Sequence, residues 1–419
     1  MWHGSRGSRV EIHGDVETRV RTAPGPPSTL AQMSHDIALL GATGFAGRLT
    51  AEHLAAHLPD DASWAIAGRS RAKLEAVAQA VADAGGNVPQ VVEADVSDAT
   101  AVRDLAESTR VLGTTVGPYV EYGEAAVAAA AAAGIAYCDL TGEPEFVDRT
   151  WLRHHAEAER TGARLVHACG FDSIPYDIGV LNTIKALREA GTDEGTPIRV
   201  RGYVRASAQF SGGTYHSAVR AFSRLRESRQ LAKQRRAAEP RQQGRRVRGL
   251  SGRPERAPDG GYALPLPTLD PQIVLRSARA LGEYGDDFGY GHFAHVKRLT
   301  TVVGAGVGGA VVLGAAQVPP LRDALLRVKT PGEGPSEQTR AKSWFRVRFH
   351  ASAGEGSGAR TLVTEARGGD PGYTETAVML GESLMALAYD DVPKVAGQVT
   401  TAVAMGEALL ERLPYFRTL

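Results

Sequence analysis

The sequence has few of the features that mark secreted, metal-binding or nucleic-acid-binding proteins. Only two cysteines, Cys138 and Cys169, occur in 419 residues. Both lie in apolar runs, so we expect buried, reduced thiols rather than a disulfide framework or a metal site. The net charge of +1 excludes electrostatic binding of nucleic acid by the molecule as a whole. Residues 1–33 lack the apolar core of a secretion signal and are expected to form a disordered extension of a cytoplasmic protein.

Long uncharged runs are also scarce, and one segment stands out. Residues 299–318 hold 20 residues without a charge, which reaches the length of a membrane-spanning helix. The run is rich in glycine, however, and each glycine costs up to ~1 kcal/mol in a helix relative to alanine. We therefore predict a buried or membrane-surface helix, with a transmembrane span as the alternative.

Charge of one sign is concentrated in a single stretch. Residues 220–256 contain 13 Lys/Arg against three Glu and almost no aromatic side chains. We interpret this basic segment as a solvated, partly disordered loop. The alternative is a patch for acidic lipid headgroups or for an acyl-carrier partner, which would place the protein at the inner face of the plasma membrane. The lack of aromatic residues argues against single-stranded nucleic acid.

Six short apolar runs alternate with helical patterns between residues 34 and 178. The expected strands are Ile37–Leu40, Trp64–Ala67, Val91–Ala94, Val111–Val116, Ile135–Asp139 and Arg164–Ala168. Apolar runs without polar alternation are typical of strands that are buried on both faces of a parallel sheet. Strict alternation of strand and helix predicts an α/β fold, a doubly wound Rossmann-type sheet.

The second half of the chain has a different pattern. Polar and apolar residues alternate along Ile198–Ala206 and again from Phe345 to His350, and Thr361–Ala366 returns as a partner strand. A helix is expected around Thr214–Gln230. These signals predict an α+β domain with a largely antiparallel sheet over 179–372.

The C-terminal part, 373–419, has helical periodicity. It predicts two closing helices, Tyr373–Tyr389 and Val392–Arg412. We expect both of them to pack back on the first domain.

A glycine pattern follows the first predicted strand. Gly41, Gly44 and Gly47, with Thr43 and Phe45 between them, form G-x-x-G-x-x-G and open a predicted helix. Such glycines permit a tight turn, close approach of the backbone to a pyrophosphate, and close contact between helix and strand. The strand–turn–helix context makes a dinucleotide site a better interpretation than a glycine turn without a ligand.

The end of the second predicted strand bears on the choice of cofactor. NAD-selective proteins usually carry an acidic residue there, whereas this chain has Arg69. An arginine can bind a 2′-phosphate with two hydrogen bonds, so we predict NADP, with NAD as the alternative. The further cofactor contacts that we expect are Ser70, Lys73, Asp95, Gly117 and Pro118.

Proton donors are sought where the predicted parallel strands end, because the crevice of such a sheet opens there. The candidates are Tyr119, Glu143, Asp172, Tyr176 and His216. A tyrosine or histidine could protonate an enolate carbon or a carbonyl oxygen. Tyr119 has the alternative of closing over the nicotinamide, and Asp172 that of a helix cap.

Several motifs occur together in one order: GATGFAG, AGRS, VGPY at 116–119, YCDLTGE at 137–143 and CGFDSIPYD at 169–177. Together they resemble the saccharopine dehydrogenase-like oxidoreductases, and most closely the branch of the trans-acting enoyl reductases. PGEGPSEQTR at 331–340 is also similar to that branch. The resemblance implies an NAD(P)-linked reductase of lipid or polyketide acyl chains, with roles in glycolipid biosynthesis and membrane association in some relatives.

The leading hypothesis is therefore an NADP(H)-dependent reductase of a small-molecule or carrier-linked acyl substrate. The alternatives are a dehydrogenase of an amino-acid-derived substrate and a non-catalytic nucleotide- or lipid-binding module. For partners we also carry a homodimer and a membrane surface contacted through 299–318 and 220–256.

Overall fold

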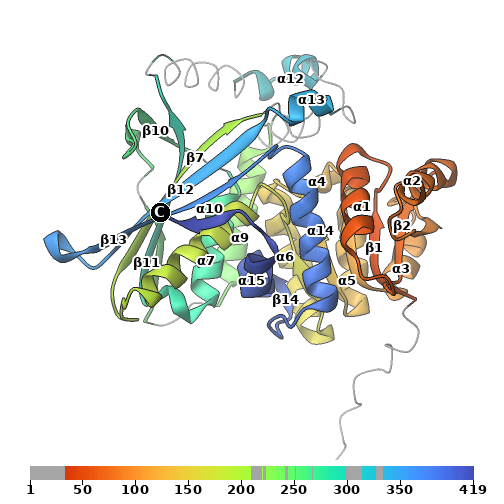
Figure 1. The fold of residues 1–419 in the computed structure, drawn as a ribbon, viewed down its shortest axis with the longest axis horizontal. Helices are drawn as coiled ribbons and strands as arrows, with labels where there is room; N and C mark the ends of the chain where they lie inside the picture. The colour runs from red at the N-terminus through yellow and green to blue at the C-terminus, as the bar shows by residue number, and fades with distance from the viewer. Residues whose placement is uncertain are drawn as a thin grey trace, which may run out of the picture. The chain divides into compact units, whose positions relative to one another are not determined.

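Figure 1 shows the fold of the chain in a computed structural model. It describes residues 34–208, 219, 223–240, 244–250, 252–266, 268–298, 300, 314–326 and 334–419. These residues belong to one compact unit, Met33–Leu419. His216 and most of the apolar segment 299–318 lie outside the described residues, as does the predicted extension 1–33.

The first sheet has seven parallel strands in the order β14-β6-β5-β4-β1-β2-β3. Its strands are β1 (His35–Leu40), β2 (Trp64–Gly68), β3 (Gln90–Glu93), β4 (Thr109–Thr114), β5 (Ala136–Asp139), β6 (Arg164–Val166) and β14 (Gly397–Val399). The central strands are continuous apolar runs and are buried on both faces. The first six strands follow the doubly wound order 3-2-1-4-5-6, which confirms the predicted Rossmann-type fold.

Helices connect these strands in strict alternation. They are α1 (Phe45–His57), α2 (Arg71–Asp83), α3 (Ala99–Glu107), α4 (Tyr119–Tyr122), α5 (Glu124–Ala133) and α6 (Pro144–Thr161). Gly134 and Gly162 end α5 and α6 in the left-handed conformation, with φ of 74° and 86°. The carboxyl ends of the strands therefore share one edge, where the connecting turns can form a common site.

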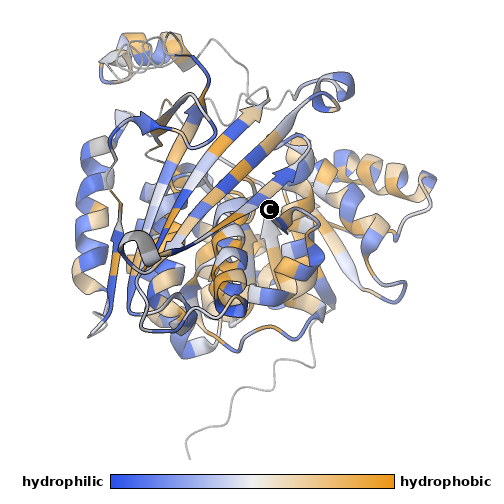
Figure 2. Cartoon of the chain, turned by 60° about the vertical axis from the view of Figure 1, so that its left-hand side comes forward, coloured by the Kyte–Doolittle hydropathy of each residue, from blue (hydrophilic) through white to orange (hydrophobic). Residues whose placement is uncertain are grey.

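The second sheet has eight strands, most of them antiparallel. They are β7 (Ile198–Ser207), β8 (Arg246–Gly249), β9 (Glu255–Arg256), β10 (Tyr262–Pro265), β11 (Asp287–Val296), β12 (Trp344–Ala353), β13 (Arg360–Gly368) and β15 (Phe416–Thr418). Two pairs, β7–β11 and β8–β11, are parallel. Hydrophilic and hydrophobic residues alternate along the strands (Figure 2). The apolar face packs on α7 (Ile174–Glu189) and α10 (Asp270–Ala280).

The prediction of a solvated, partly disordered basic loop is wrong in one respect, because the described parts of the segment form regular helix and strand rather than loop. They form α9 (Leu225–Ala238), then β8 and β9. Arg235 is only 3% exposed, and its Nε donates to Asp148 Oδ1 on α6 at 2.5 Å. A buried ion pair thus anchors the helix. The local excess of positive charge gave no sign of this pair, because the partner, Asp148, lies far away in the sequence. The described part of the helix ends at Ala238, beyond the predicted end at Gln230.

The C-terminal part also differs from the prediction. The first helix, α14 (Thr374–Tyr389), lies beside α1 (Figure 1). The second begins later than predicted, as α15 (Thr401–Arg412), because Gly397–Val399 forms the seventh strand of the first sheet beside β6. Gly397 has a φ of +96°, which interrupts a right-handed helix, and the apolar residues after it were misread as helical.

The remaining elements are short. They are α12 (Pro319–Leu326), α13 (Glu337–Arg340) and the 3₁₀ turns Gly282–Tyr284 and Gly356–Gly358. Among the described residues, no helix is both long and apolar enough to cross a membrane.

Candidate functional site

The glycine turn lies between β1 and α1, against the end of β4. Gly41 has a φ of +93°, and a Cβ there would lie 2.6 Å from Val116 Cγ2. A Cβ on Gly47 would lie 2.2 Å from the Gly41 carbonyl oxygen. The Thr115 hydroxyl donates to that same carbonyl at 3.0 Å and fixes the turn. Only glycine satisfies the backbone and the space at both positions.

The outer side of the turn is open. Thr43 and Gly44 are exposed, and a Cβ on Gly44 would meet only the Gly41 carbonyl, at 3.4 Å. No side chain caps the N-terminus of α1, and its first turn holds no acidic residue. The free N–H groups and the positive end of the helix dipole therefore face this opening. These residues fit the pyrophosphate of a dinucleotide.

Aromatic and basic side chains from the second half of the chain lie over the turn. The Phe45 ring packs edge-on against Tyr373, with ring centroids 4.6 Å apart. The Arg340 guanidinium lies 5.5 Å from the Phe45 ring centroid, and its Nη1 donates to Thr374 Oγ1 at 3.0 Å. Residues 334–340, the described part of the PGEGPSEQTR motif, thus lie next to the glycine turn.

Arg69, Ser70 and Lys73 lie at the end of β2 and the start of α2. Arg69 and Lys73 are exposed, Ser70 is the N-cap of α2, and the first turn of the helix has no acidic residue. Within the described parts of the chain, neither cation forms an ion pair. The arrangement can therefore receive a phosphate group.

Asp95 follows β3 and forms a local turn. Its carboxylate accepts from the Ser97 backbone N–H at 2.9 Å and from the Ser97 hydroxyl at 2.8 Å. These hydrogen bonds lower the pKa of Asp95, and the charge of Arg69 lowers it further. Asp95, one of the predicted cofactor contacts, therefore lies near Arg69, just after the end of β3.

Tyr119 is placed away from the open crevice. The Gly117–Pro118 peptide bond is cis and leads directly into α4, where Tyr119 is buried. Its hydroxyl donates to the Thr114 carbonyl and accepts from the Leu140 N–H, both at 3.1 Å. Burial raises the pKa of Tyr119 well above 10. Its phenol therefore ties the end of β4 to the end of β5.

Glu143 makes contacts similar to those of a helix cap. Its carboxylate accepts from the backbone N–H groups of Tyr119 at 3.1 Å and of Val120 at 2.8 Å. It therefore supports the start of α4, next to the Gly117–Pro118 turn.

Asp172 lies in the turn between β6 and α7. Its side chain is exposed by surface area, yet protein atoms surround it closely enough to desolvate the carboxylate. A Cβ on Gly142 would lie 2.7 Å from Asp172 Oδ2, so glycine leaves room for the carboxylate. Desolvation raises the pKa of Asp172 to about 6.

Behind Asp172 lies a buried group of four polar side chains: Tyr176, Asp270, Tyr290 and His292. We name these four residues and Asp172 the acid–histidine cluster. The Tyr176 ring packs edge-on against the His292 ring at 4.7 Å, and the Tyr290 hydroxyl pairs with His292 Nδ1 at 3.0 Å.

Two atoms of the cluster, His292 Nε2 and Asp270 Oδ1, have no hydrogen-bond partner among the described residues. His292 Nε2 and Asp270 Oδ2 are 3.7 Å apart, too far for a hydrogen bond. Burial lowers the pKa of His292 to about 3, so the ring is neutral at pH 7. Burial, aided by the charge of Asp172, raises the pKa of Asp270 well above its ordinary value. Unpaired buried polar atoms indicate space for a ligand or water.

The fold therefore brings two of the predicted donors, Asp172 and Tyr176, into one cluster. Tyr119 and Glu143 lie at the neighbouring strand ends, and His216 falls outside the described residues. Asp270 and His292 were missed, because they come from α10 and β11, far along the chain. For Asp270, the one local signal in the sequence is the proline that follows it, because an Asp-Pro pair is typical of the start of a helix.

Known proteins resemble this chain over almost its full length. Residues 37–166 match the family model for the saccharopine dehydrogenase NADP binding domain. A trans-acting enoyl reductase of Mycobacterium ulcerans is 38% identical over 412 residues, covering 92% of this chain and 96% of the relative. One of Mycobacterium tuberculosis (strain H37Rv) is 36% identical over 414 residues, with the same two coverages.

A solved structure supports the fold. Apo saccharopine dehydrogenase (L-Glu forming) from Saccharomyces cerevisiae superimposes with a TM-score of 0.53 at 13% identity, covering 91% of this chain and 99% of that one. The chain is thus an NAD(P)-dependent oxidoreductase whose first domain binds NADP, and it belongs to the trans-acting enoyl reductases within the saccharopine dehydrogenase-like family.

Proposed function

We propose that this oxidoreductase reduces the carbon–carbon double bond of an α,β-unsaturated acyl thioester on a lipid or polyketide chain. The printed names of its relatives support this class of reaction. The observation that carries the proposal is Asp172, a carboxyl group in the turn after β6 whose pKa desolvation raises to about 6. A carboxyl group with this pKa is partly protonated near neutral pH and can act as a general acid.

In this proposal the glycine turn and the N-terminus of α1 hold the pyrophosphate of NADPH. Arg69 and Lys73 bind the 2′-phosphate together with the Ser70 hydroxyl. Gly117 and Pro118, which follow the end of β4, would contact the nicotinamide ribose. NADPH supplies the hydride to the β-carbon of the substrate.

Two residues of the chain then stabilise the charge that forms on the substrate and supply the proton that it takes up. Negative charge develops on the thioester oxygen as the hydride arrives. Within the described parts of the chain, the Tyr176 hydroxyl makes no hydrogen bond, and its pKa is raised well above 10 by burial. It therefore keeps its proton and donates a hydrogen bond to that oxygen. Protonated Asp172 transfers its proton to the α-carbon, which completes the single bond, and solvent reprotonates the carboxylate.

An amino-acid-derived substrate is the second candidate. Asp172 and the buried Asp270 are neighbouring carboxyl groups, and an ionised carboxylate would bind an ammonium group. The two candidates need opposite forms of Asp172. Reduction of an enoyl thioester needs the protonated acid, whereas binding of an amine needs the carboxylate.

The test is NADPH oxidation with a crotonyl-type thioester. We expect Asp172→Asn to lower kcat by about 10²–10⁴-fold, because the amide cannot give up a proton. Glu189→Gln, an exposed change at the far end of α7, is the matched control and should leave kcat unchanged. Turnover that survives in Asp172→Asn would exclude Asp172 as the acid.

The pH profile tests the protonation state. Because the acid form is the active one, kcat of the wild type should fall as the pH rises above about 6. A rise of activity over the same range would favour the amine substrate instead.

Stability separates a catalytic loss from unfolding. The folded pKa of about 6 exceeds the ordinary 3.8, so ionisation of Asp172 destabilises the folded state as pH rises through this window. Asp172→Asn should therefore melt no lower than the wild type at pH 8.

A further inference from the structure

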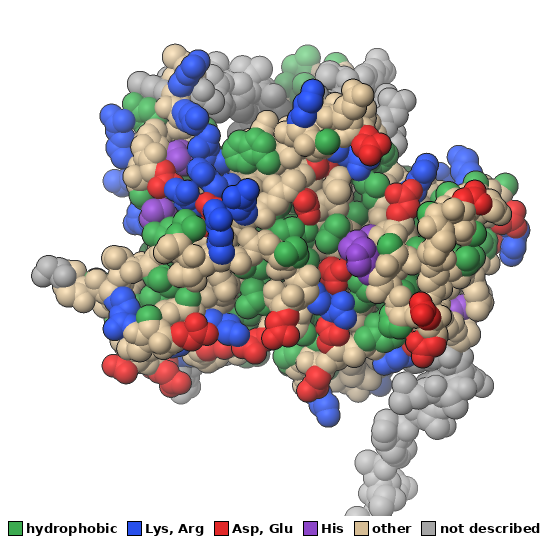
Figure 3. Space-filling model, in the orientation of Figure 1, with side chains coloured by type: hydrophobic (Ala, Val, Ile, Leu, Met, Phe, Trp, Pro, Cys, Tyr) green, Lys and Arg blue, Asp and Glu red, His purple; other side chains and the backbone are tan. Residues whose placement is uncertain are grey.

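The outer face of the second sheet carries three arginines in one line. On three neighbouring strands, Arg346 of β12 lies directly opposite Arg205 of β7 on one side and Arg367 of β13 on the other. We name these three residues the arginine row. The helices α7 and α10 pack on the opposite, apolar face of the sheet. Lys and Arg side chains gather over this part of the surface (Figure 3).

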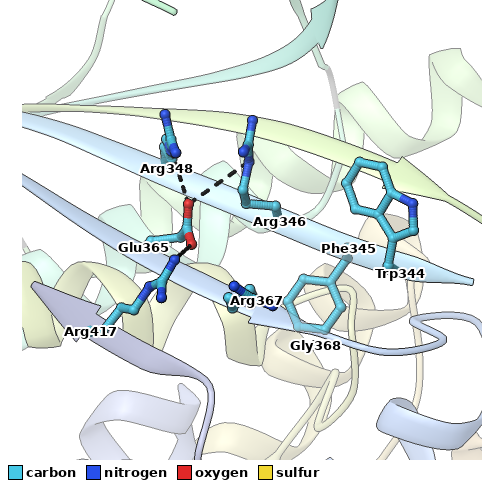
Figure 4. A pocket seen from close by; sticks show the side chains of 8 residues that line it. All are labelled: Trp344, Phe345, Arg346, Arg348, Glu365, Arg367, Gly368 and Arg417. Carbon is cyan, nitrogen blue, oxygen red and sulfur yellow. Dashed lines mark hydrogen bonds and ion pairs between the residues drawn. The ribbon is translucent and has the colours of Figure 1, made fainter. Parts of the chain in front are cut away.

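The neighbouring line of residues is charge-balanced. Glu365 is 1% exposed and accepts from Arg348 Nε at 2.8 Å and from Arg417 Nη2 at 2.5 Å. Arg348 also donates to Asp259 at 2.7 Å. The Arg346 guanidinium is 3.8 Å from the same carboxylate (Figure 4). Glu365 is thus already shared among three arginines and cannot neutralise the arginine row.

The arginine row is electrostatically unfavourable as it stands. Like charges directly opposite on neighbouring strands destabilise a sheet. Burial and the charges of Arg348 and Arg205 lower the pKa of Arg346. In the described chain, neither Arg205 nor Arg367 forms an ion pair. Among the described residues, none of the three guanidiniums donates a side-chain hydrogen bond, and Arg346 keeps only a long ion pair with Glu365. Guanidiniums held at strand spacing in this way are suited to the oxygens of a phosphate group.

A cavity of 260 Å³ lies beside Arg346 and Arg367 of the arginine row (Figure 4). It is lined by Trp344, Phe345, Arg346, Arg367 and their neighbours. Trp344 is 39% exposed, and the Arg205 guanidinium lies 5.7 Å from its ring centroid. The cavity can hold a single phosphate ester with its adjoining alkyl chain. A second copy of this chain on the same face would bring two arginine rows together, which their charge disfavours.

The arginine row also lies near the cofactor turn. Trp344 follows α13, whose Arg340 packs on the Phe45 ring. At the other side, β13 ends at Gly368, and the chain then reaches Tyr373, which contacts the same ring. A ligand held by its phosphate on the arginine row could therefore extend past these residues toward the cleft.

We propose that the arginine row binds the phosphate of a phosphopantetheine arm, the group that carries acyl thioesters on coenzyme A and on carrier proteins. The choice of a thioester arm rests on the proposed function, whereas phosphate binding itself does not. Arg205, Arg346 and Arg367 bind the phosphate oxygens, and Trp344 covers the alkyl chain.

Calorimetric titration tests binding without turnover. The full-length protein should bind 4′-phosphopantetheine at least about tenfold more tightly than pantetheine, since charge-assisted hydrogen bonds contribute on this scale. Arg367→Glu should abolish the difference. Arg360→Glu, an exposed arginine at the other end of β13, is the matched control and should keep it. Equal affinity for the two compounds, or equal loss in both variants, would overturn the proposal.

Two further measurements distinguish a phosphopantetheine phosphate from a lipid phosphate. They also distinguish failure of the proposed function from failure of the arginine-row proposal. Arg367→Glu should raise KM for a crotonyl-coenzyme A thioester about tenfold at unchanged kcat, while a truncated N-acetylcysteamine thioester is unaffected. If neither thioester is reduced, the proposed function fails, and the titration still decides on the arginine row. Binding of phosphatidic acid vesicles without binding of phosphopantetheine would overturn the thioester assignment.

Discussion

At the scale of single residues, cofactor choice depends on a side chain outside the glycine turn. Arg69 is exposed at the end of β2, beside Lys73 and without an ion pair to any described residue. Reversing its charge should repel a 2′-phosphate and leave the turn intact. We expect Arg69→Glu to raise KM for NADPH by about tenfold or more, with little change for NADH. Steady-state kinetics with both cofactors measure this ratio.

Arg71→Glu is the matched control for that change. Arg71 is also exposed and lies two residues further on, but its Nη1 is 3.5 Å from Glu75 on the same helix. If the added negative charge acted only through long-range electrostatics, both variants would weaken NADPH binding equally. Unchanged selectivity in Arg69→Glu would mean that other groups bind the 2′-phosphate.

The residues of the site differ in how far sequence predicts them. Gly41 and Gly47 are constrained by contacts within one turn, so a short motif reveals them. Asp172 was found because it follows a strand end, which is also a local feature. Asp270 and His292 reach the site only through the packing of α10 on α7 and on β11. No periodicity or spacing encodes that packing, so these residues could not be placed from sequence.

At the scale of elements, the basic helix α9 shows why a charge run can mislead. A local excess of arginine suggests an irregular segment exposed to solvent. Arg235, however, is buried and pairs with Asp148 on α6, a helix that lies far away in the sequence. Burial raises the pKa of Asp148, while the charge of Arg235 opposes that shift. Removing one partner leaves an uncompensated buried charge. We expect Arg235→Ala to lower the free energy of unfolding by about 3–5 kcal/mol, measured by denaturant titration.

The neighbouring position supplies the control for α9. Arg236 is exposed on the same helix, so Arg236→Ala should change stability by less than about 0.5 kcal/mol. Adding Asp148→Asn to Arg235→Ala should recover part of the loss, because the buried charge is then removed. Equal effects of the two alanine variants would mean that the buried pair does not anchor the helix.

At the scale of the whole molecule, alternating strands and helices made the first sheet predictable, whereas the joining of the two sheets was not. Their apolar faces share one core, in which Ile37 and Trp64 of the first sheet belong to the same cluster as Val200 and Phe349 of the second. The C-terminal segment adds β14 to one sheet and β15 to the other. The pairing of Gly397 with Arg164 joins residues far apart in the chain, and such links leave no local pattern.

A shared core has a consequence for unfolding. Residues 33–419 form one compact unit, so calorimetry should show a single cooperative transition rather than one for each sheet. NADPH binds only the folded chain. At a concentration of 100 times its Kd it should raise the free energy of unfolding by about 2.7 kcal/mol, and the transition should move to a higher temperature. NADH at the same concentration should shift it less, because it lacks the 2′-phosphate. Two separate transitions, of which NADPH moved only one, would show that the sheets unfold independently despite their common core.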